Sequence, residues 1–535
     1  MRQTVELKGR PASGGIAFGP LVVLRKTLSK RAGSGNADTE RRMLHEAITA
    51  AAKDIAGIAG QANGEARDIL GFQLALLEDD TMKEAAFSLI EDGKAADEAW
   101  RQAVDCEIAG YAGSEDDYFR GRAADIADMR DRVACHLAGE EVLEEFPPGA
   151  ILAADEMAPT LFLQTDWSQG GGMLLTAGSA TSHVAMLARA RGVPMIVGVG
   201  EVDLGGHAEA IIDGETGAAV LSPGSGDRRR YDARLSEIRA RAVTEATFLR
   251  RPAMSADGVG IELLINVAGV KELEQIDSAS CDGIGLMRSE FLFRDGASLP
   301  GEEEQYQAYR RFLEWAAGKP VTIRTLDAGA DKPIRGLTPE GERNPFLGRR
   351  GVRLTLARPD IFRTQLRALA RAAVHGRLKV MIPMVTVADE LMESARLLDE
   401  AVMELRAEGI ACERPPLGIM VEVPAVAIAP EFFAEAAFFS IGSNDLTQYV
   451  IACARDEASL SALSQARHPA VLKLIEAVAE FGGARRIPVS LCGDMASDPQ
   501  YLRDLLKAGL RSLSVAPSAI GRIKAALSAT IIGSG

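Results

Sequence analysis

The sequence has few cysteines and no long apolar run. Only 6 of its 535 residues are Cys, and they are scattered without the paired spacing of a zinc site or a disulfide framework. No stretch reaches the roughly 18 apolar residues of a membrane-spanning helix, and the start, MRQTVELKGRPASGG, has no apolar core of a signal peptide. We therefore expect reduced thiols, a cytoplasmic location and no insertion into a membrane.

An excess of basic residues is also absent. Lys and Arg number 60 against 75 Asp and Glu, which gives a formal net charge of −15. Nucleic acids and anionic membranes require a basic surface, so this balance argues against both as the main partner. An anionic substrate would need a local cluster of Arg and Lys.

The length and the composition indicate a globular protein of several domains. Hydrophobic residues make up 47% and charged residues 25%, which are ordinary values for a folded chain. A single hydrophobic core stops growing well below 535 residues, so we expect two to four domains.

The first half of the chain predicts a small α/β domain with a helical insert. Residues 1–30 and 144–225 contain short apolar strands broken by Gly and Pro. Residues 31–143 between them are rich in Ala, Leu, Glu and Arg at helical spacing, which predicts a helical bundle. Residues 226–256 are dense in charges of both signs and predict a solvated linker helix.

Residues 257–535 predict a barrel. Eight strand-like runs alternate there with helical stretches, and this number and length suit a (β/α)8 TIM barrel. The runs are VGIELLINV, GIGLMRS, PVTIRTLD, LKVMIPMV, LGIMVEV, AFFSIGSND, IPVSLCG and LRSLSVA.

Polar residues follow these runs where a barrel places its active site, at the carboxyl ends of the strands. They are Asn266, Arg288, Glu290, Arg324, Asp327, Glu422, Asn444, Asp445 and Cys492, with Lys332 and Arg455 in the loops. Carboxylates at adjacent strand ends suit Mg²⁺, and guanidinium groups suit a small substrate with phosphate and carboxylate groups. Phosphoryl transfer needs this combination; salt bridges between the same groups are the structural alternative.

Cys492 lies at the end of the seventh run, before Gly493. An isolated cysteine in such a place is by default a buried, inert thiol. Its position on the rim also makes it a candidate proton donor, because transfer out of an enol phosphate leaves an enolate that must be protonated.

The run GMLLTAGSATSHVAMLARARGVPMIVG predicts a strand, a tight loop and a helix that begins near Ser182. Thr181 or Ser182 can cap the helix, which places His183 at its positive end. That setting favours a neutral, nucleophilic imidazole and then an anion attached to it. A histidine with a purely structural role is the alternative.

Several long motifs resemble Enzyme I of the bacterial phosphotransferase system, the family of phosphoenolpyruvate-protein phosphotransferases. The resemblance covers nearly the whole chain. Its motifs are GRPASGGIAFG, LLEDD, YFRGRAADIADMRDRV, TSHVAMLARARGVPMIVG, GLMRSEFLF, RTLDAGADK, NPFLGRRGVR, IMVEVPA, FFSIGSNDLTQY, ACARD and LCGDMA.

The resemblance implies a swivelling phosphohistidine domain with a helical subdomain that binds the carrier protein HPr, and a barrel that binds phosphoenolpyruvate and forms a homodimer. It implies autophosphorylation with release of pyruvate, then transfer to HPr, the first step of sugar transport by this system. By likeness, the implied roles are His183 as the phosphohistidine, Cys492 as proton donor, Arg288, Arg324, Asn444, Asp445 and Arg455 as substrate ligands, Glu422 and Asp445 as Mg²⁺ ligands, and Leu76, Met82, Phe119 and Arg122 as carrier contacts.

The chain departs from the family pattern at three places. Ser179 follows Gly178 where the family usually has a second Gly, Asp494 stands where it usually has Glu, and the tail after the last strand is short. The Asp494 carboxylate keeps its charge, but any hydrogen bond that it makes could move.

Three other functions are less well supported. Pyruvate phosphate dikinase and phosphoenolpyruvate synthase need an ATP-grasp domain, for which the helical insert is too short. The nitrogen-related paralogue carries an N-terminal sensory domain, for which residues 1–20 leave no room. A regulatory binding module would have lost catalytic rim residues, and all are present. We expect the histidine domain to swing between the barrel rim and the carrier.

Overall fold

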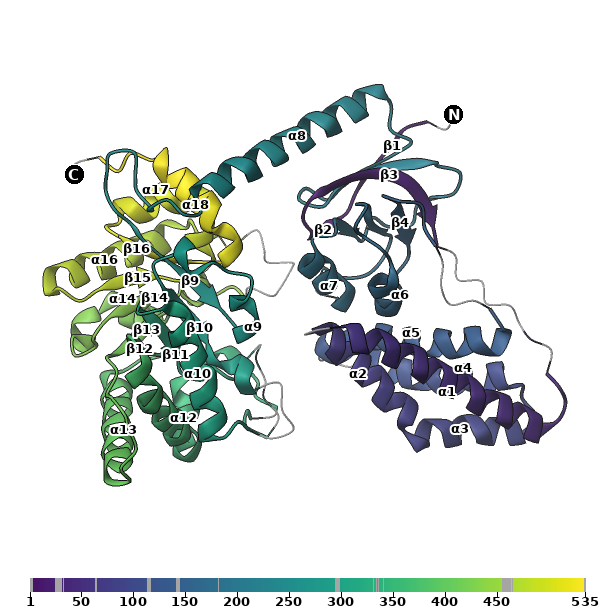
Figure 1. Ribbon diagram of the computed structural model, residues 1–535, viewed down its shortest axis with the longest axis horizontal. Helices are drawn as coiled ribbons and strands as arrows, with labels where there is room; N and C mark the ends of the chain where they lie inside the picture. The colour runs from purple at the N-terminus through teal and green to yellow at the C-terminus, as the bar shows by residue number, and fades with distance from the viewer. Residues whose placement is uncertain are drawn as a thin grey trace. The chain divides into compact units, whose positions relative to one another are not determined.

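The structure is a computed structural model with two compact units, Met1–Ile238 and Arg239–Gly535 (Figure 1). No described helix is long and apolar enough to cross a membrane. The side chains of residues 61, 65, 112 and 117–121 are not described. The described residues are 3–24, 31, 33–62, 65–112, 117–140, 145–180, 182–293, 299–330, 332, 334, 336–339, 341–454, 463 and 465–533.

The first unit contains an eight-stranded sheet with the strand order β1-β8-β7-β3-β4-β5-β6-β2. The middle strands β3 to β6 run parallel, and β4 and β5 are wholly buried, as expected for uninterrupted apolar runs. The strands are β1 Val5–Lys8, β2 Arg10–Ser13, β3 Ile16–Val23, β4 Ile151–Ala154, β5 Gly172–Leu175, β6 Met195–Val197, β7 Glu209–Asp213 and β8 Ala218–Leu221, with helices α6 Pro159–Gln164 and α7 His183–Arg191.

A bundle of helices is inserted between β3 and β4, at the place predicted for it. The Asn36 and Asp79 side chains cap α1 and α3 by accepting hydrogen bonds from the Thr39 and Thr81 amides, at 3.0 and 2.8 Å. Trp100 is fully buried in the core of the bundle. The helices are α1 Ala37–Gln61, α2 Glu65–Glu78, α3 Asp80–Glu91, α4 Ala96–Ala112 and α5 Asp117–Ala138.

A buried carboxylate joins this bundle to the α/β part. Asp128 on α5 accepts hydrogen bonds from the Thr160 amide at 3.0 Å and the Thr160 hydroxyl at 2.7 Å, which caps α6 from outside its own segment. Burial raises the pKa of Asp128, although the bonds from Thr160 and the charge of Arg132 act in the opposite direction.

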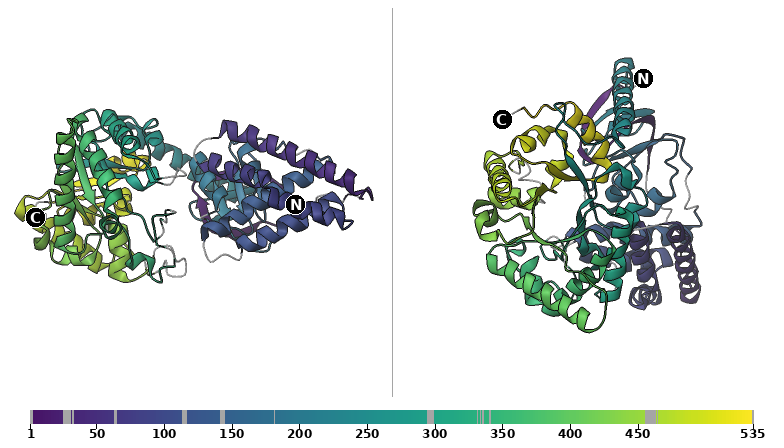
Figure 2. Two further views of the ribbon diagram at one scale, coloured as in Figure 1. Left: turned by 90° about the horizontal axis from the view of Figure 1, so that it is seen from below. Right: turned by 60° about the vertical axis from the view of Figure 1, so that its left-hand side comes forward.

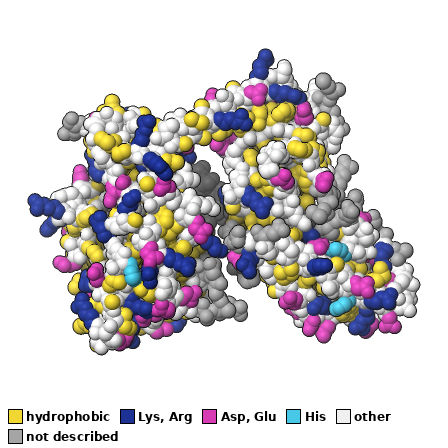
Figure 3. All heavy atoms as spheres, in the orientation of Figure 1, with side chains coloured by type: hydrophobic (Ala, Val, Ile, Leu, Met, Phe, Trp, Pro, Cys, Tyr) yellow, Lys and Arg dark blue, Asp and Glu magenta, His cyan; other side chains and the backbone are white. Residues whose placement is uncertain are grey.

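Helix α8, Ser225–Phe248, runs from the first unit into the second. It has no buried residue, as its mixed charges predict. Near its start, Arg234 pairs with Glu215 at 2.9 Å, and beyond its end Lys524 donates to the Leu249 carbonyl at 2.8 Å. Acidic and basic side chains are likewise intermixed over the face of the molecule in Figure 3.

The second unit confirms the predicted barrel. Eight parallel strands close on themselves, and each corresponds to one of the eight apolar runs. Helices surround them (Figure 2). The strands are β9 Glu262–Val267, β10 Ile284–Arg288, β11 Val321–Arg324, β12 Leu378–Ile382, β13 Leu417–Val421, β14 Phe439–Ile441, β15 Val489–Leu491 and β16 Ser512–Val515; the helices are α9 Val270–Leu273, α10 Glu302–Ala316, α11 Val352–Ala357, α12 Pro359–Ala372, α13 Ala388–Ala407, α14 Pro424–Ile428, α15 Ser443–Ile451, α16 Pro469–Arg485, α17 Pro499–Lys507 and α18 Ile520–Ser528.

Candidate active site

A cavity of about 420 Å³ lies at the carboxyl ends of the barrel strands. Because neighbouring parallel strands end at the same rim, residues far apart in the sequence meet there. Six predicted site residues line this cavity, and Arg455 lies outside the described residues. The lining is Leu286, Arg288, Glu290, Phe291, Arg324, Lys332, Met420, Glu422, Gly442, Asn444, Asp445, Cys492, Gly493 and Asp494.

One side of the cavity holds a compact cluster of opposite charges. Arg324, only 4% exposed, pairs with Glu290 and, at 3.1 Å, with Asp327. Lys332 lies 3.2 Å from Glu290 and 2.9 Å from Asp327. Burial alone would raise the pKa of Asp327, but the neighbouring cations hold it well below its usual value. Both carboxylates are therefore charged, and each cation is held in a fixed place.

Arg288 differs from these cations. It ends β10 and lines the same cavity, but the part of the chain that the structure describes contains no ion-pair partner for it. An arginine that lines a cavity and forms no ion pair with a protein carboxylate is suited to bind an anionic ligand.

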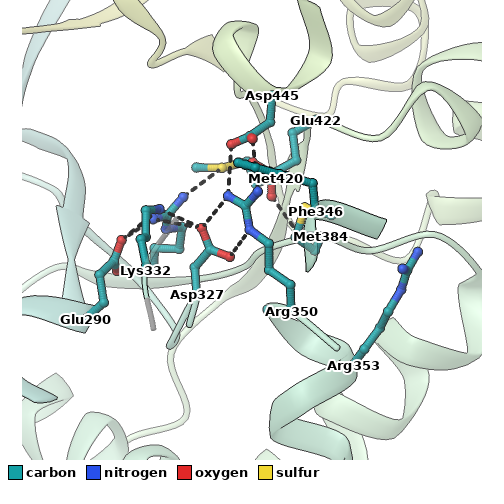
Figure 4. A network of polar contacts seen from close by, with 12 residues as sticks. Glu290, Asp327, Lys332, Phe346, Arg350, Arg353, Met384, Met420, Glu422 and Asp445 are labelled. Carbon is teal, nitrogen blue, oxygen red and sulfur yellow. Dashed lines mark hydrogen bonds and ion pairs between the residues drawn. The ribbon is translucent and has the colours of Figure 1, made fainter. Parts of the chain in front are cut away.

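Arg350 joins the charge cluster to the other side of the cavity (Figure 4). Its guanidinium is fully buried and donates two hydrogen bonds to Asp327, at 3.0 and 3.1 Å, and two to Asp445, at 3.1 and 3.2 Å. Burial would lower the pKa of Arg350, but the two carboxylates raise it above its usual value. The planar guanidinium thus fixes the distance between two strand ends.

Sequence reasoning assigned no role to Arg350. The residue comes after the 3-10 turn Pro345–Leu347, so it follows no strand run. The available signal was its place in the motif NPFLGRRGVR. Arg353, three residues further on, points away from the cluster (Figure 4).

Glu422 is the carboxylate opposite Arg350. Its Oε1 accepts a hydrogen bond from the Met384 amide at 2.7 Å, whereas its buried Oε2 has no hydrogen-bond partner among the described residues. Burial and the charges of Asp445 and Asp327 raise the pKa of Glu422 to about 8. A bare buried carboxylate oxygen beside a second carboxylate fits a hard cation such as Mg²⁺.

The protein supplies only part of a metal coordination shell. Within the described ranges, no group of three or more His, Cys, Asp or Glu side chains could hold a metal ion. Glu422 and Asp445 therefore suit a cation that takes its remaining ligands from water and from substrate oxygens, as Mg²⁺ commonly does.

Cys492 lies in the cavity wall with 3% of its surface exposed. It packs in an apolar cluster with Leu286, Met381, Met420 and Phe438. Burial raises the pKa of the Cys492 thiol, so it keeps its proton near neutral pH. A protonated thiol against an apolar wall can act as a general acid.

The second candidate site is His183, the first residue of α7. The Ser182 side chain caps this helix by accepting from the Ala185 amide at 3.3 Å; Thr181, the other predicted cap, lies outside the described residues. Arg189 of the same helix donates to the Ala12 and Ala180 carbonyls at 2.7 and 2.8 Å, which anchors the loop before His183.

The partner of His183 comes from the helical insert. The Nδ1 of His183 lies 2.9 Å from Oδ2 of Asp125, a fully buried residue of α5, and Arg122 contacts the same oxygen at 3.2 Å. From the sequence, only the position of His183 at the positive end of the helix supported a neutral, nucleophilic imidazole. The carboxylate adds a separate effect, because it favours a proton on Nδ1.

The predicted carrier contacts lie in different environments. Leu76 is partly buried against the bundle core, whereas Met82 is 7% exposed and belongs to that core. Arg122 is 8% exposed and lies 4.5 Å from the ring of Phe72. The Phe119 side chain lies outside the described part. Met82 and Arg122 are therefore largely buried.

Comparisons with known proteins match the chain to three domain models. They are the PEP-utilising enzyme, N-terminal, over residues 8–122, the PEP-utilising enzyme, mobile domain, over residues 146–217, and the PEP-utilising enzyme, PEP-binding domain, over residues 243–531. The last model alone matches more than half of the chain.

Curated relatives agree with these models. The phosphoenolpyruvate-protein phosphotransferase of Enterococcus faecalis is 33% identical over 96% of this chain and 92% of its own length. That of Haloferax volcanii is 40% identical over 76% of this chain and 72% of its own length. The multiphosphoryl transfer protein of Rhodobacter capsulatus is 37% identical over 84% of this chain, and the match spans only 54% of that longer protein.

The position of Arg350 generates a test of stability. In Arg350→Met, Asp445 loses its ion pair with Arg350, whereas Asp327 keeps those with Arg324 and Lys332, so we expect the free energy of unfolding of the barrel unit to fall by about 3–5 kcal/mol. Urea denaturation followed by circular dichroism measures this loss. Arg353→Met is the matched control. Among the described residues, Arg353 bonds only to the Leu347 and Gly348 carbonyls and the Thr386 hydroxyl, so its loss should cost about 1 kcal/mol. Equal losses of unfolding free energy in both variants would contradict the role of Arg350 as the buried partner of Asp327 and Asp445.

Proposed function

The chain belongs to the family of phosphoenolpyruvate-protein phosphotransferases, and on that premise we propose that phosphoenolpyruvate binds in the barrel cavity and gives its phosphoryl group to His183. The observation that carries the proposal is the convergence of six residues on one cavity. Arg288, Arg324, Glu422, Asn444, Asp445 and Cys492 line it together. Phosphate ligands, carboxylates for a cation and a proton donor are the parts that this reaction needs.

Different polar residues of the cavity bind the two ends of the substrate. Arg288, which has no ion-pair partner among the described residues, and the amide of Asn444 bind the phosphoryl group. Arg324 and Lys332 are held by Glu290 and Asp327 and present fixed positive charge to the other end of the substrate. We also assign Arg455 to the substrate. Preorganised charges of this kind favour a transition state in which charge spreads over the phosphoryl oxygens.

Glu422 and Asp445 would hold Mg²⁺, which when bound neutralises charge on the substrate phosphate. The electrostatics of the described residues favour such a cation. Arg288, Arg324, Lys332 and Arg350 face the carboxylates of Glu290, Asp327, Asp445 and Asp494, and a bound cation would favour the charged form of Glu422 as well. An anionic substrate therefore gains from an additional positive charge between the two carboxylates.

His183 reacts through Nε2. Asp125 accepts the Nδ1 proton, so the tautomer that it selects carries its lone pair on Nε2. The phosphorus–oxygen bond of phosphoenolpyruvate breaks as the Nε2–phosphorus bond forms, and the electron pair leaves with the enolate. The Cys492 thiol donates its proton to the methylene carbon of the enolate, which gives pyruvate, and the thiolate regains a proton from water.

The proposed reaction brings together groups of both units. His183 belongs to the first unit and the cavity to the second. We propose that residues 1–30 and 144–225 act as the swivelling phosphohistidine domain, with α8 as the linker between the units. In a second transfer, the phosphoryl group passes from His183 to a histidine of HPr docked on the helical insert around Leu76 and Phe119.

We further propose that the barrel unit forms a homodimer. Several of its large apolar side chains are exposed, among them Ile428 and Phe432, each at 69%. These two residues lie four positions apart, on α14 and the 3-10 turn that follows it. Isolated apolar residues are common on surfaces, but adjacent large ones are typical of protein contacts.

Phosphoryl transfer to His183 is tested with phosphoenolpyruvate labelled on phosphorus. Incubation with Mg²⁺ should label the protein, and addition of HPr should move the label to HPr. His183→Ala should remove the label, because the proposed acceptor of the phosphoryl group is then absent. His45→Ala, which changes an exposed histidine of α1, is the control and should be labelled normally. Label retained on His183→Ala would contradict the proposal.

The role of Cys492 is tested by pyruvate formation. Cys492→Ala removes the proton donor and should slow the release of pyruvate by about 10²- to 10⁴-fold. A coupled assay with lactate dehydrogenase measures the rate. Cys412→Ala changes a half-buried thiol outside the cavity and serves as control. An unchanged rate in Cys492→Ala would remove Cys492 from the mechanism.

A further inference from the structure

We propose that Asp494 is a positioning residue, which sets the amide of Asn444 in the orientation that binds the phosphoryl group. This inference rests on the proposed function. Both side chains line the barrel cavity.

Two reciprocal hydrogen bonds connect the residues. Nδ2 of Asn444 donates to Oδ2 of Asp494 at 2.9 Å, and the backbone amide of Asp494 donates to Oδ1 of Asn444 at 2.9 Å. An isolated Asn amide could turn by 180° and exchange its donor and acceptor. Here each end of the amide has a partner of one kind, so only one orientation satisfies both bonds.

The orientation leaves a donor for the substrate. The Nδ2 group of Asn444 carries two hydrogens, and Asp494 accepts one of them. The other can be donated to a phosphoryl oxygen. Turned by 180°, Asn444 would present an oxygen to that anion and would repel it. Asp494 therefore acts on the substrate through the orientation of Asn444.

The backbone that carries Asp494 is itself fixed. A Cβ atom at Gly493 would lie 1.8 Å from the Ser443 hydroxyl, so the turn after β15 packs directly on the start of α15. The Cys492 amide donates to the Ile441 carbonyl at 3.0 Å, and Asn266 donates to the Cys492 carbonyl at 3.0 Å. The turn that presents Cys492 to the cavity thus also presents Asp494 to Asn444.

The length of the Asp494 side chain suits this arrangement. Its backbone amide and its own carboxylate bond to the same Asn444 side chain, so the carboxylate has to stay close to its main chain. A glutamate adds a methylene and a rotatable bond, which moves the carboxylate away from that position. Asp494→Glu should therefore weaken the interaction, although it restores the family residue.

The test is a double-mutant cycle of substrate binding. In the full chain with His183→Ala, which cannot turn over, calorimetry with Mg²⁺ measures the Kd of phosphoenolpyruvate. Asp494→Ala should raise this Kd about tenfold, because one positioned charge-assisted bond is lost. On a background of Asn444→Ala, the same change should raise it less than about twofold. Asp494→Asn keeps an acceptor oxygen and should restore most of the affinity.

Equal effects of Asp494→Ala with and without Asn444 would overturn the inference, because a merely structural or electrostatic role is additive. Asp498→Ala is the matched control; Asp498 caps α17 through the Gln500 amide at 3.0 Å and lies outside the cavity lining. Far-UV circular dichroism confirms that each variant is folded. If the His183→Ala chain binds phosphoenolpyruvate but the losses of affinity are additive, this inference alone is contradicted. If the chain does not bind phosphoenolpyruvate, the proposed function is contradicted as well.

Discussion

The active site depends on one buried cation, the guanidinium of Arg350. Asp327 and Asp445 lie on opposite sides of it, and the burial of a carboxylate is costly unless a cation is paired with it. Because the four hydrogen bonds are planar and directional, they fix the two strand ends at one separation. Arg324 and Lys332 are held by the first carboxylate, and the proposed cation site begins at the second. The cations that we assign to the substrate and the proposed metal ligands are thereby arranged as one unit.

The histidine site uses a buried carboxylate in a different way. Asp125 is placed between Arg122 and Nδ1 of His183, so a residue of the helical insert favours one tautomer of the histidine that begins α7. In the proposed reaction the barrel supplies the charge that transfer requires. The first unit supplies His183, whose Nδ1 contacts Asp125 of α5.

The barrel strands and their polar ends could be predicted from the sequence, whereas contacts between residues of distant elements could not. Wholly buried parallel strands are continuous apolar runs, so all eight barrel strands and their polar ends could be read directly. Arg350 follows a loop, and Asp125 precedes His183 by 58 residues on another element, so neither pairing leaves a pattern along the chain. Met82 has helical spacing, which does not distinguish a core residue from a docking residue. Asp494 was visible as a departure and Asn444 as a site residue, but the contact between them was not.

The central claim is that the phosphoryl group of phosphoenolpyruvate reaches one particular nitrogen of this chain. Phosphorus NMR on the protein after incubation with phosphoenolpyruvate and Mg²⁺ tests this most directly, because the two ring nitrogens of histidine give distinct phosphoramidate signals. The account predicts a single phosphohistidine signal from Nε2 of His183, since Asp125 engages Nδ1. A signal from Nδ1, or one that persists in His183→Ala, would contradict it.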